Sequence, residues 1–174
     1  MDRTQAESQL TEVVKKVQAG EANAQGELIT LTQERLFKFC LLLGHNRELA
    51  EDLCQESFIR AIQNIQKLKN PETFIGWLYQ IAKNLFIDTK RSAANKEFVS
   101  DESVKEVGQA SNMDLILNVQ RTLQIFDPDE RLLLLLIELE GYSYKEAGDL
   151  VGLSEDAVRS KLHRLKGTFI KNFK

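Results

Sequence analysis

The sequence predicts an all-α protein with two small helical domains joined by a flexible linker. Apolar residues recur at helical spacing over most of the 174-residue chain, and only two prolines interrupt it. No segment has a credible strand pattern. Hydrophobic residues make up 43% and charged residues 28% of the chain, which indicates a folded protein and argues against a disordered one. We expect the first domain at residues 1–92, the linker at 93–112 and the second domain at 113–174.

The first domain is expected to begin with two helices. Apolar residues at helical spacing predict one helix over residues 10–17, and Gly20 ends it. A second helix is expected from Ala24 through the apolar run 36–43. A turn at residues 44–46 follows it.

Two further helices complete the first domain. A long helix is expected over residues 47–65, with its apolar positions spaced to form one buried face. Residues 67–74 form a loop, because Asn70 precedes Pro71 and is biased away from helical backbone angles. The next helix covers residues 75–91.

The expected linker has almost no periodic apolar signal, and charge is distributed unevenly around it. Residues 97–114 carry a net charge of −4, whereas residues 79–96 and 143–174 each carry +3, within a total of −3. The total argues against non-specific nucleic-acid binding by the whole chain. Two basic patches are therefore separated by an acidic segment.

The second domain is expected to begin with a helix over residues 113–125. Asp127 is placed to cap the next helix, with Pro128 at its first position, where the missing N–H of proline costs nothing. The following run, residues 132–137, is apolar on every side of a helix. We expect it to form the core of this domain.

The last part of the chain has the pattern of a helix-turn-helix. Ser143 and Glu146 are spaced to form a capping box for a helix that ends near Val151. Gly152 supplies the tight turn, and Ser154 caps a second helix. A basic helix held at a fixed angle by a partner helix is typical of one that enters the DNA major groove. The basic side chains of this helix are Arg159, Lys161, His163, Arg164 and Lys166.

Two residues of this motif bear on how its helices pack. Leu153 is expected to plug the angle between them. Gly148 lies inside the first helix, where glycine costs about 1 kcal/mol relative to alanine. This glycine either permits closer packing of the two helices or weakens the motif.

Several classes of protein are excluded by the sequence. No apolar run approaches the roughly 18 residues of a membrane span, and the first ten residues lack the apolar core of a signal peptide. We therefore expect a cytoplasmic protein without membrane insertion. Cys40 and Cys54 suit a reducing compartment, and their spacing with His45 matches no strong zinc pattern. No metal and no other cofactor is expected.

The long helix over residues 47–65 carries one polar face. Asp52, Gln55 and Glu56 stand at positions i, i+3 and i+4, and Arg60 extends the same face. A solvated helix surface is the simplest interpretation. The paired carboxylates of an all-helical enzyme are a second one, but no pocket, nucleophile or metal cluster supports it in the sequence.

Aromatic and basic residues are interleaved in the segment FIGWLYQIAKNLFIDTKR, residues 74–91. This combination suits the binding of unstacked nucleotide bases beside a neutralised phosphate backbone. For Trp77 the alternative is a place in the core, since large aromatic side chains are mostly packing residues.

These segments together resemble bacterial sigma factors of the extracytoplasmic-function (ECF) type. GHNRELAEDLCQESFIRAIQNI (residues 44–65) with FIGWLYQIAKNLFIDTKR resembles their region 2, and QLTEVVKKVQAGEANAQGELITL (residues 9–31) resembles their first helices. FDPDERLLLLLIELEGYSYKEAGDLVGLSEDAVRSKLHRLK (residues 126–166) resembles their region 4. A lone helix-turn-helix occurs in many regulators, but the two motifs in this order are highly specific.

The resemblance implies three sets of functional residues. The polar face of the long helix would dock on RNA polymerase, with contact or support from Asp52, Leu53, Gln55, Glu56 and Phe58. The loop and helix that follow would bind and open the −10 promoter element through Lys69, Asn70, Phe74, Trp77, Lys83, Asn84, Asp88 and Arg91. The final helix would read the −35 element through Ser154, Glu155, Asp156, Arg159, Ser160, Lys161, His163 and Arg164.

Within the final helix, arginine and lysine would have different roles. A bidentate contact from arginine to guanine contributes about 1–3 kcal/mol of discrimination between bases. Lys161 stands where arginine is common in the family, and lysine more often contacts phosphate, which sets salt dependence without sequence preference.

The implied function is that of a sigma factor, which directs core RNA polymerase to promoters for transcription initiation in a stress or envelope response. The expected partners are core RNA polymerase, promoter DNA and an anti-sigma factor, and the chain is not itself an enzyme. The acidic linker residues would discourage DNA binding by the free chain; they include Asp101, Glu102 and Glu106. The main alternative is a stand-alone helix-turn-helix regulator that binds duplex operator DNA without polymerase, usually as a dimer.

Overall fold

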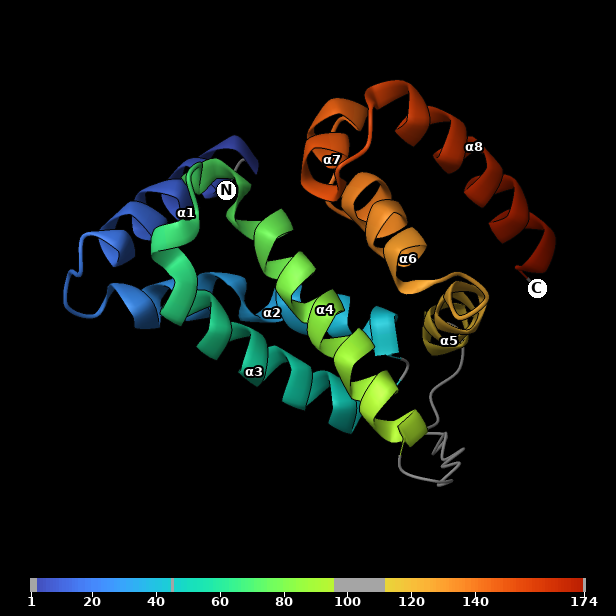
Figure 1. Cartoon of the computed structure of the whole chain (residues 1–174), viewed down its shortest axis with the longest axis horizontal. Helices are drawn as coiled ribbons and strands as arrows, with labels where there is room; N and C mark the ends of the chain where they lie inside the picture. The colour runs from blue at the N-terminus through green and yellow to red at the C-terminus, as the bar shows by residue number, and fades with distance from the viewer. Residues whose placement is uncertain (1–2, 45, 96–111, 174) are drawn as a thin grey trace.

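The computed structural model describes residues 3–44, 46–95 and 112–173, and this part of the chain contains helices and no strand (Figure 1). The helices form two groups, α1–α4 and α5–α8, as the all-α prediction requires. Most of the expected linker, with its acids Asp101, Glu102 and Glu106, lies outside the described residues, as does His45.

The first group is a four-helix bundle in which α2 and α4 are central. α1, α3 and α4 all pack on α2, and α3 also packs on α4 (Figure 1). Two single 3₁₀ turns, η1 and η2, occupy the loop expected between α3 and α4. The bounds are α1 Arg3–Gln18, α2 Ala24–Gly44, α3 Arg47–Asn64, η1 Ile65–Lys67, η2 Pro71–Thr73 and α4 Phe74–Asn95.

The second group consists of four shorter elements and one long helix. The α6 helix continues into a π-helical turn, η3, and α8 packs across α5, α6 and α7. The bounds are α5 Asn112–Leu123, α6 Pro128–Leu134, η3 Leu135–Leu139, α7 Tyr144–Val151 and α8 Glu155–Asn172. The buried residues of the apolar run in α6 and η3 confirm that it is the core of this group: Leu132, Leu133, Leu134, Leu135 and Leu136.

Side chains at the helix starts hold the second group as predicted. Asp127 and Ser143 each accept a hydrogen bond from the backbone N–H three residues on, and each is part of a complete capping box. Ser154 accepts from the Ala157 N–H at 3.2 Å and starts α8. Gly152 ends α7 at φ +74°, in the left-handed region that glycine adopts readily.

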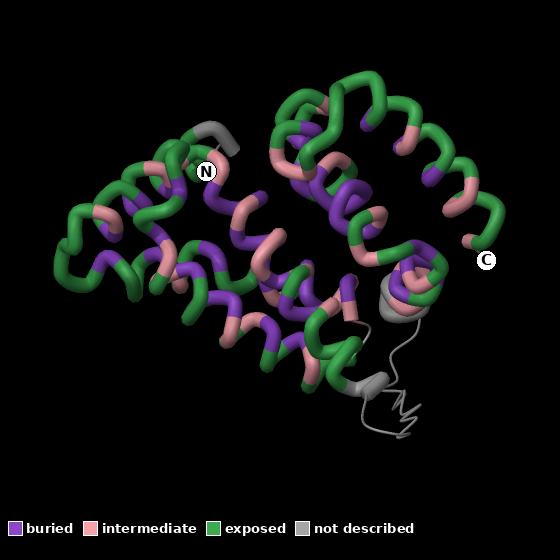
Figure 2. The backbone as a smooth tube through the Cα atoms, viewed as in Figure 1, coloured by how far each residue is buried: buried purple, intermediate pink, exposed green. Residues whose placement is uncertain are grey.

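Burial follows one face of most helices, as Figure 2 shows by the purple stretches that point between the elements. In α8 the inner positions Val158, Leu162 and Leu165 are buried, and the rest of the helix is largely exposed. Periodic apolar spacing therefore identified the faces that pack.

The expectation for Leu153 was wrong. Its side chain is 39% exposed and does not fill the angle between α7 and α8. The backbone does so instead, because a Cβ at Gly148 would stand only 2.5 Å from the Leu153 carbonyl oxygen. Gly148 therefore permits closer packing of the two helices, the first of the two alternatives that the sequence left open.

The two groups of helices are in contact. α4 packs against α6 and α7, and α2 packs against α5 and α6. Arg131 of α6 is 7% exposed; it donates to the Phe126 carbonyl at 2.9 Å and, across the contact, to the Leu43 carbonyl at the end of α2. The chain is thus closed, with its second group packed on its first.

Candidate functional site: protein-binding and nucleic-acid-binding surfaces

The polar face of α3 is exposed, as a docking surface must be. Asp52 and Gln55 are exposed, and Glu56 is half-exposed and pairs with Arg60 at 3.0 Å. A surface ion pair of this kind contributes little stability, so it exchanges readily for a contact with a partner. Neither Asp52 nor Glu56 lines either of the two clefts described below.

Two residues assigned to the polymerase contact lie inside the bundle. Leu53 and Phe58 are 3% and 7% exposed, because they occupy the opposite, apolar face of α3. The prediction allowed these side chains either to contact polymerase or to support the residues that do. Because both are buried, only the supporting role remains, in which they fix the position of the exposed face.

The loop before α4 presents polar groups to solvent. Lys69 and Asn70 are exposed, and the Asn70 side chain accepts from the Glu72 N–H at 3.1 Å, which caps η2. Phe74 is 0% exposed, so the expectation that it contacts a base is wrong for this conformation. Its ring anchors the start of α4 in the core.

Four of the predicted α4 residues share one face of the helix. Trp77, Asn84, Asp88 and Arg91 are spaced by seven, four and three residues, which places them in line along α4. The last three are exposed. Trp77 is half-buried, with its ring centroid 6.2 Å from that of Phe74, so the tryptophan packs on the core and still reaches the surface.

Lys83 lies on a different face of α4 from these four. Its ammonium group pairs with Asp129 of α6 at 2.6 Å, and its side chain is only 14% exposed. No pattern in the sequence indicates this partner, which is 46 residues away. In the closed chain Lys83 therefore faces the second group of helices.

The helix-turn-helix presents the outer face of α8. The predicted side chains Ser154, Glu155, Asp156, Arg159, Ser160, His163 and Arg164 are all exposed, and Lys161 is half-buried. The buried inner face of α8 holds this surface at a fixed angle to α7. A helix in this setting is suited to entering a major groove.

Three of the predicted cations of α8 are paired with nearby carboxylates. Arg159 contacts Glu155 at 3.0 Å and Asp156 at 3.6 Å, and its guanidinium lies 5.8 Å from the Tyr144 ring centroid. Lys161 and Arg164 both approach Glu130 of α6, at 3.6 and 3.8 Å. These pairs lie on two sides of the helix, with Arg159 on one and Lys161 and Arg164 on the other.

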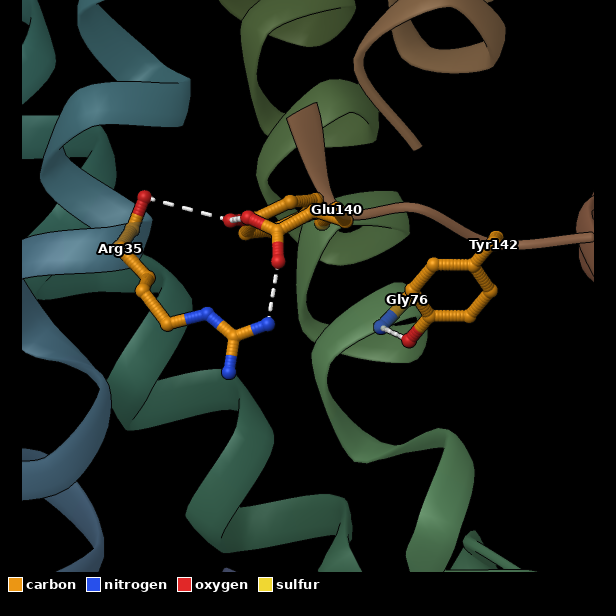
Figure 3. Close-up of polar contacts among 5 residues, drawn as sticks. Arg35, Gly76, Glu140 and Tyr142 are labelled. Carbon is orange, nitrogen blue, oxygen red and sulfur yellow. Dashed lines mark hydrogen bonds and ion pairs between the residues drawn. The ribbon is translucent and has the colours of Figure 1, made fainter. Parts of the chain in front are cut away.

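Sequence reasoning missed a buried polar cluster between the two groups of helices. Glu140, at the end of η3, is 6% exposed; its carboxylate accepts from the Arg35 guanidinium and from the Tyr79 hydroxyl at 2.5 Å (Figure 3). Burial, with the Glu140 charge, raises the pKa of Tyr79 well above its usual range. Burial opposes the charge on Arg35, but the Glu140 hydrogen bond and charge outweigh it and raise the pKa of Arg35. No periodic signal marks a single acid after an apolar run, so only the fold could reveal it.

Two clefts accompany these surfaces. One of about 630 Å³ opens between α1 and the segment after η3, and its lining includes Lys15, Arg35 and Glu140. The other, about 440 Å³, is a mostly apolar groove between α5, η3 and α8, where Leu139 and Ile170 are 49% and 74% exposed. Exposed apolar surface of this kind is typical of protein-binding sites.

The described residues offer neither a metal site nor a membrane span. No group of three or more histidine, cysteine, aspartate or glutamate side chains in this part of the chain is placed to hold a metal ion. No described helix is both long enough and apolar enough to cross a bilayer. Cys40 is buried and Cys54 half-buried, both as free thiols, and burial raises the pKa of each.

The described residues form a helical protein with a helix-turn-helix and an exposed polar face on α3, and comparisons with known proteins specify its family. Two family models match, Sigma-70 region 2 over residues 28–96 and Sigma-70, region 4 over residues 116–167. The chain is 31% identical to the RNA polymerase sigma factor CarQ of Myxococcus xanthus over 150 residues, 83% of this chain and 86% of CarQ. The chain therefore belongs to the sigma-70 family of RNA polymerase sigma factors, and to its ECF group. We call α1–α4 region 2 and α5–α8 region 4.

Other comparisons agree with this family. The ECF RNA polymerase sigma factor SigE of Mycolicibacterium smegmatis is 32% identical over 147 residues, 79% of this chain. The chain spans 57% of the length of SigE and 40% of another relative, from Xanthomonas campestris. The sigma factor RpoE of Bartonella quintana, solved with the anti-sigma factor NepR, has the same fold, with a TM-score of 0.69 and 20% identity over 86% of this chain and 96% of that one.

Proposed function

We propose that this protein directs core RNA polymerase to specific promoters and initiates transcription there. The observation that carries the proposal is the presence of both region matches, in order, on one chain that exposes a polar α3 face and a basic helix-turn-helix. One surface binds the enzyme and the other binds DNA. Polymerase supplies the chemistry, and the chain has no enzymatic activity of its own.

The α3 face is the proposed polymerase contact. Asp52, Gln55 and Glu56 make the contact, while Leu53 and Phe58 support it from the core. We expect Asp52→Ala with Gln55→Ala to abolish capture of core polymerase in a pull-down while the helical circular dichroism stays unchanged. Gln33→Ala with Glu34→Ala is the matched control, because both residues are exposed on α2. Retained capture by the α3 variant would refute this assignment.

Promoter DNA is the proposed partner of the other two surfaces. The loop with Lys69 and Asn70 accepts an unstacked base of the −10 element, at a cost of a few kcal/mol that the loop and backbone contacts must offset. The α4 face with Trp77, Asn84 and Arg91 lies along the strand being opened. Asp88 lies on that face, and Lys83, on a neighbouring face, would contact the DNA backbone. In α8, Arg159 and Arg164 read bases of the −35 element while Lys161 and His163 contact phosphate.

An anti-sigma factor is the third proposed partner, and the cytoplasm, where polymerase works, is the proposed location. RpoE of Bartonella quintana has this fold and was solved with its anti-sigma factor. The exposed groove between α5, η3 and α8 provides apolar surface for a protein partner. The response that such a partner controls is proposed to be one to stress or to the cell envelope.

Run-off transcription tests the whole proposal. Purified core polymerase is supplied with a library of bacterial promoter fragments, with and without the chain. We expect a defined subset of fragments to yield transcripts only when the chain is present. A chain that binds duplex DNA tightly by itself and adds no transcripts would instead support the stand-alone regulator.

A further inference from the structure

The first helix, α1, lies against the loop between α3 and α4 (Figure 1). It packs on both single turns of that loop, η1 and η2. The core fixes α1 in place, because Val13, Val14 and Val17 are 1%, 0% and 5% exposed. The Sigma-70 region 2 match begins at residue 28, so α1 precedes the matched segment. A firmly held helix therefore stands beside the loop proposed to accept a base of the −10 element.

Gln18, the last residue of α1, joins this helix to the loop. Its side-chain amide donates to the Ile65 carbonyl at 2.9 Å and to the Leu68 carbonyl at 2.8 Å, which uses both donors of the NH₂ group. Ile65 and Leu68 are themselves buried, at 3% and 7% exposed. The Leu68 N–H also donates to the Ile65 carbonyl, at 3.2 Å, but in the described part of the chain the Leu68 carbonyl accepts from Gln18 alone. Loss of this amide would leave that carbonyl unpaired, which is costly at a buried position.

The contact between α1 and the loop is reciprocal. Gln66, in η1, donates through its side chain to the Gln18 backbone carbonyl at 2.7 Å. Gln18 ends α1, and Ile65 caps the C-terminus of α3, so two helices end at this point. The last carbonyls of a helix have no intrahelical N–H to pair with. Each glutamine thus satisfies carbonyl groups at the place where the opposite helix ends.

The exposed residues proposed to contact the −10 base, Lys69 and Asn70, follow directly in the chain. They lie between two buried anchors, Leu68 and Phe74. On the side toward α4, the Asn70 carbonyl accepts from the Thr73 N–H at 3.1 Å and from its hydroxyl at 2.8 Å, so this side is held by the loop itself. The side toward α3 depends on another helix.

Gln18 supplies the hydrogen bonds from that other helix. In the described part of the chain, every hydrogen bond that ties residues 65–68 to a helix other than α3 involves Gln18. The amide therefore braces the loop on the side where the fold offers no second tie by hydrogen bonds.

A loop that is held before binding recognises a base better than a loose one, for two reasons. Ordering a loop on binding costs conformational entropy, which the contacts with the partner must offset. Hydrogen bonds to a base edge also weaken steeply when donor and acceptor are misaligned, whereas attraction to phosphate carries no sequence information. Loss of the brace should therefore reduce selectivity at the −10 element more than it reduces general affinity for DNA.

We propose that Gln18 is a positioning residue for recognition of the −10 element. Through the carbonyls of Ile65 and Leu68 it sets where the loop presents its exposed side chains, and it touches no DNA itself. Its role in recognition rests on the proposed function, whereas the bracing of the loop does not. Helical periodicity does not reveal this contact, which joins residues 47 and 50 positions apart.

Hydrogen exchange in the loop tests the brace. Gln18→Met keeps the length of the side chain but removes both donors. We expect the backbone amides of residues 66–74 to exchange about fivefold faster, the equivalent of one lost hydrogen bond, with unchanged helical circular dichroism. Gln9→Met is the matched control, because Gln9 is exposed on the same helix. This control should exchange at the rates of the wild type.

Promoter selectivity tests the role in recognition. A promoter found in the run-off assay is compared with one derivative substituted in the −10 element and another substituted in the −35 element. With polymerase, Gln18→Met should lower the preference over the −10 derivative about fivefold and leave the preference over the −35 derivative unchanged. Gln18→Arg again offers donors to both carbonyls and should recover the −10 preference. General damage to the fold would lower transcription from all three promoters alike.

Wild-type exchange rates in Gln18→Met would overturn the brace. Faster exchange with an unchanged −10 preference, an equal fall in both preferences, or no recovery in Gln18→Arg would overturn the role in recognition. Run-off transcription by the wild-type chain separates these results from failure of the proposed function. A wild-type chain that yields no transcripts removes that function and leaves the exchange result standing.

Discussion

At the scale of single residues, Gly148 and Gly76 show two different uses of a helical glycine. Gly148 lets the backbone of the turn approach α7, whereas Gly76 lets a side chain of the other region enter α4. Both positions would gain helix propensity from alanine. The close contact outweighs that gain in each case. The neighbour of Gly148 is backbone and cannot move aside, whereas the neighbour of Gly76 is the side chain of Leu150, which can.

Gly148→Ala should therefore destabilise region 4. The new Cβ would stand 2.5 Å from the Leu153 carbonyl oxygen, and relief of such an overlap costs about 1–3 kcal/mol. Urea unfolding followed by circular dichroism measures the change. Gly167→Ala in α8, where nothing lies within 4 Å, is the control and should gain up to about 1 kcal/mol. Equal stability of the two variants would contradict the close approach.

Arg159→Ala should reduce promoter selectivity. If Arg159 reads a guanine, its loss removes about 1–3 kcal/mol of discrimination between the cognate −35 sequence and one altered at that base. The loss of affinity for DNA of unrelated sequence should be smaller. Competition between cognate and substituted promoters in run-off assays with polymerase provides the measurement. Lys171→Ala, exposed near the end of α8, should leave the ratio unchanged. A ratio unaffected by Arg159→Ala would remove this residue from base reading.

At the scale of elements, hydrogen bonds at helix starts define the helix-turn-helix. The Ser143 hydroxyl and backbone N–H both donate to Glu146, at 2.6 and 2.8 Å, and Glu146 N–H donates back to Ser143 Oγ at 3.2 Å. These hydrogen bonds, the hydroxyl's first, lower the pKa of Glu146. The capping box is local in sequence, which explains why the pattern of residues predicted it correctly.

Ser143→Ala should destabilise region 4 by about 1 kcal/mol near neutral pH. Because the pKa of Glu146 is lowered on folding, its contribution is present above the ordinary value of 4.5 and is lost as the pH falls through the folded value. The difference between variant and wild type should therefore shrink in acid. Thermal unfolding between pH 7 and pH 3 tests this, with exposed Ser92→Ala as control. A difference that stays constant with pH would contradict the role of Glu146.

At the scale of the whole molecule, we expect the arrangement of charge to make the free chain a poor DNA-binding protein. The net charge is −3, and the cations of α8 are paired with carboxylates of their own region. Exposed pairs of this kind are weak, so DNA phosphates can displace them. Under the proposed function, we expect selectivity for promoters only from the assembly with polymerase.

The acids between the two regions should add to this effect. Replacement of Asp101, Glu102 and Glu106 with the corresponding amides removes three negative charges between two basic patches. We expect tighter binding of the free chain to promoter duplex at low salt, and a smaller gain at higher salt because screening shortens the range of these charges. Fluorescence anisotropy across a salt series measures both, and unchanged affinity at low salt would end the idea.

The sequence by itself determined the helices, their buried faces and the surfaces they expose. Helical periodicity and capping act between residues three or four apart, so α3, α7 and α8 and the exposed polar set on α3 could be predicted. The sequence alone could not distinguish the exposed members of a motif from the buried ones, as Phe74 and Leu153 show. Their environment depends on the angle at which a neighbouring element arrives.

Only the tertiary structure decided how the two regions meet. The Glu140 cluster joins residues 61 and 105 positions apart, and Lys83 finds Asp129 across 46. Helical periodicity does not connect such distant positions. The pattern within each helix would be the same whether or not the two groups of helices were in contact. The partner of a buried charge is fixed by packing between helices.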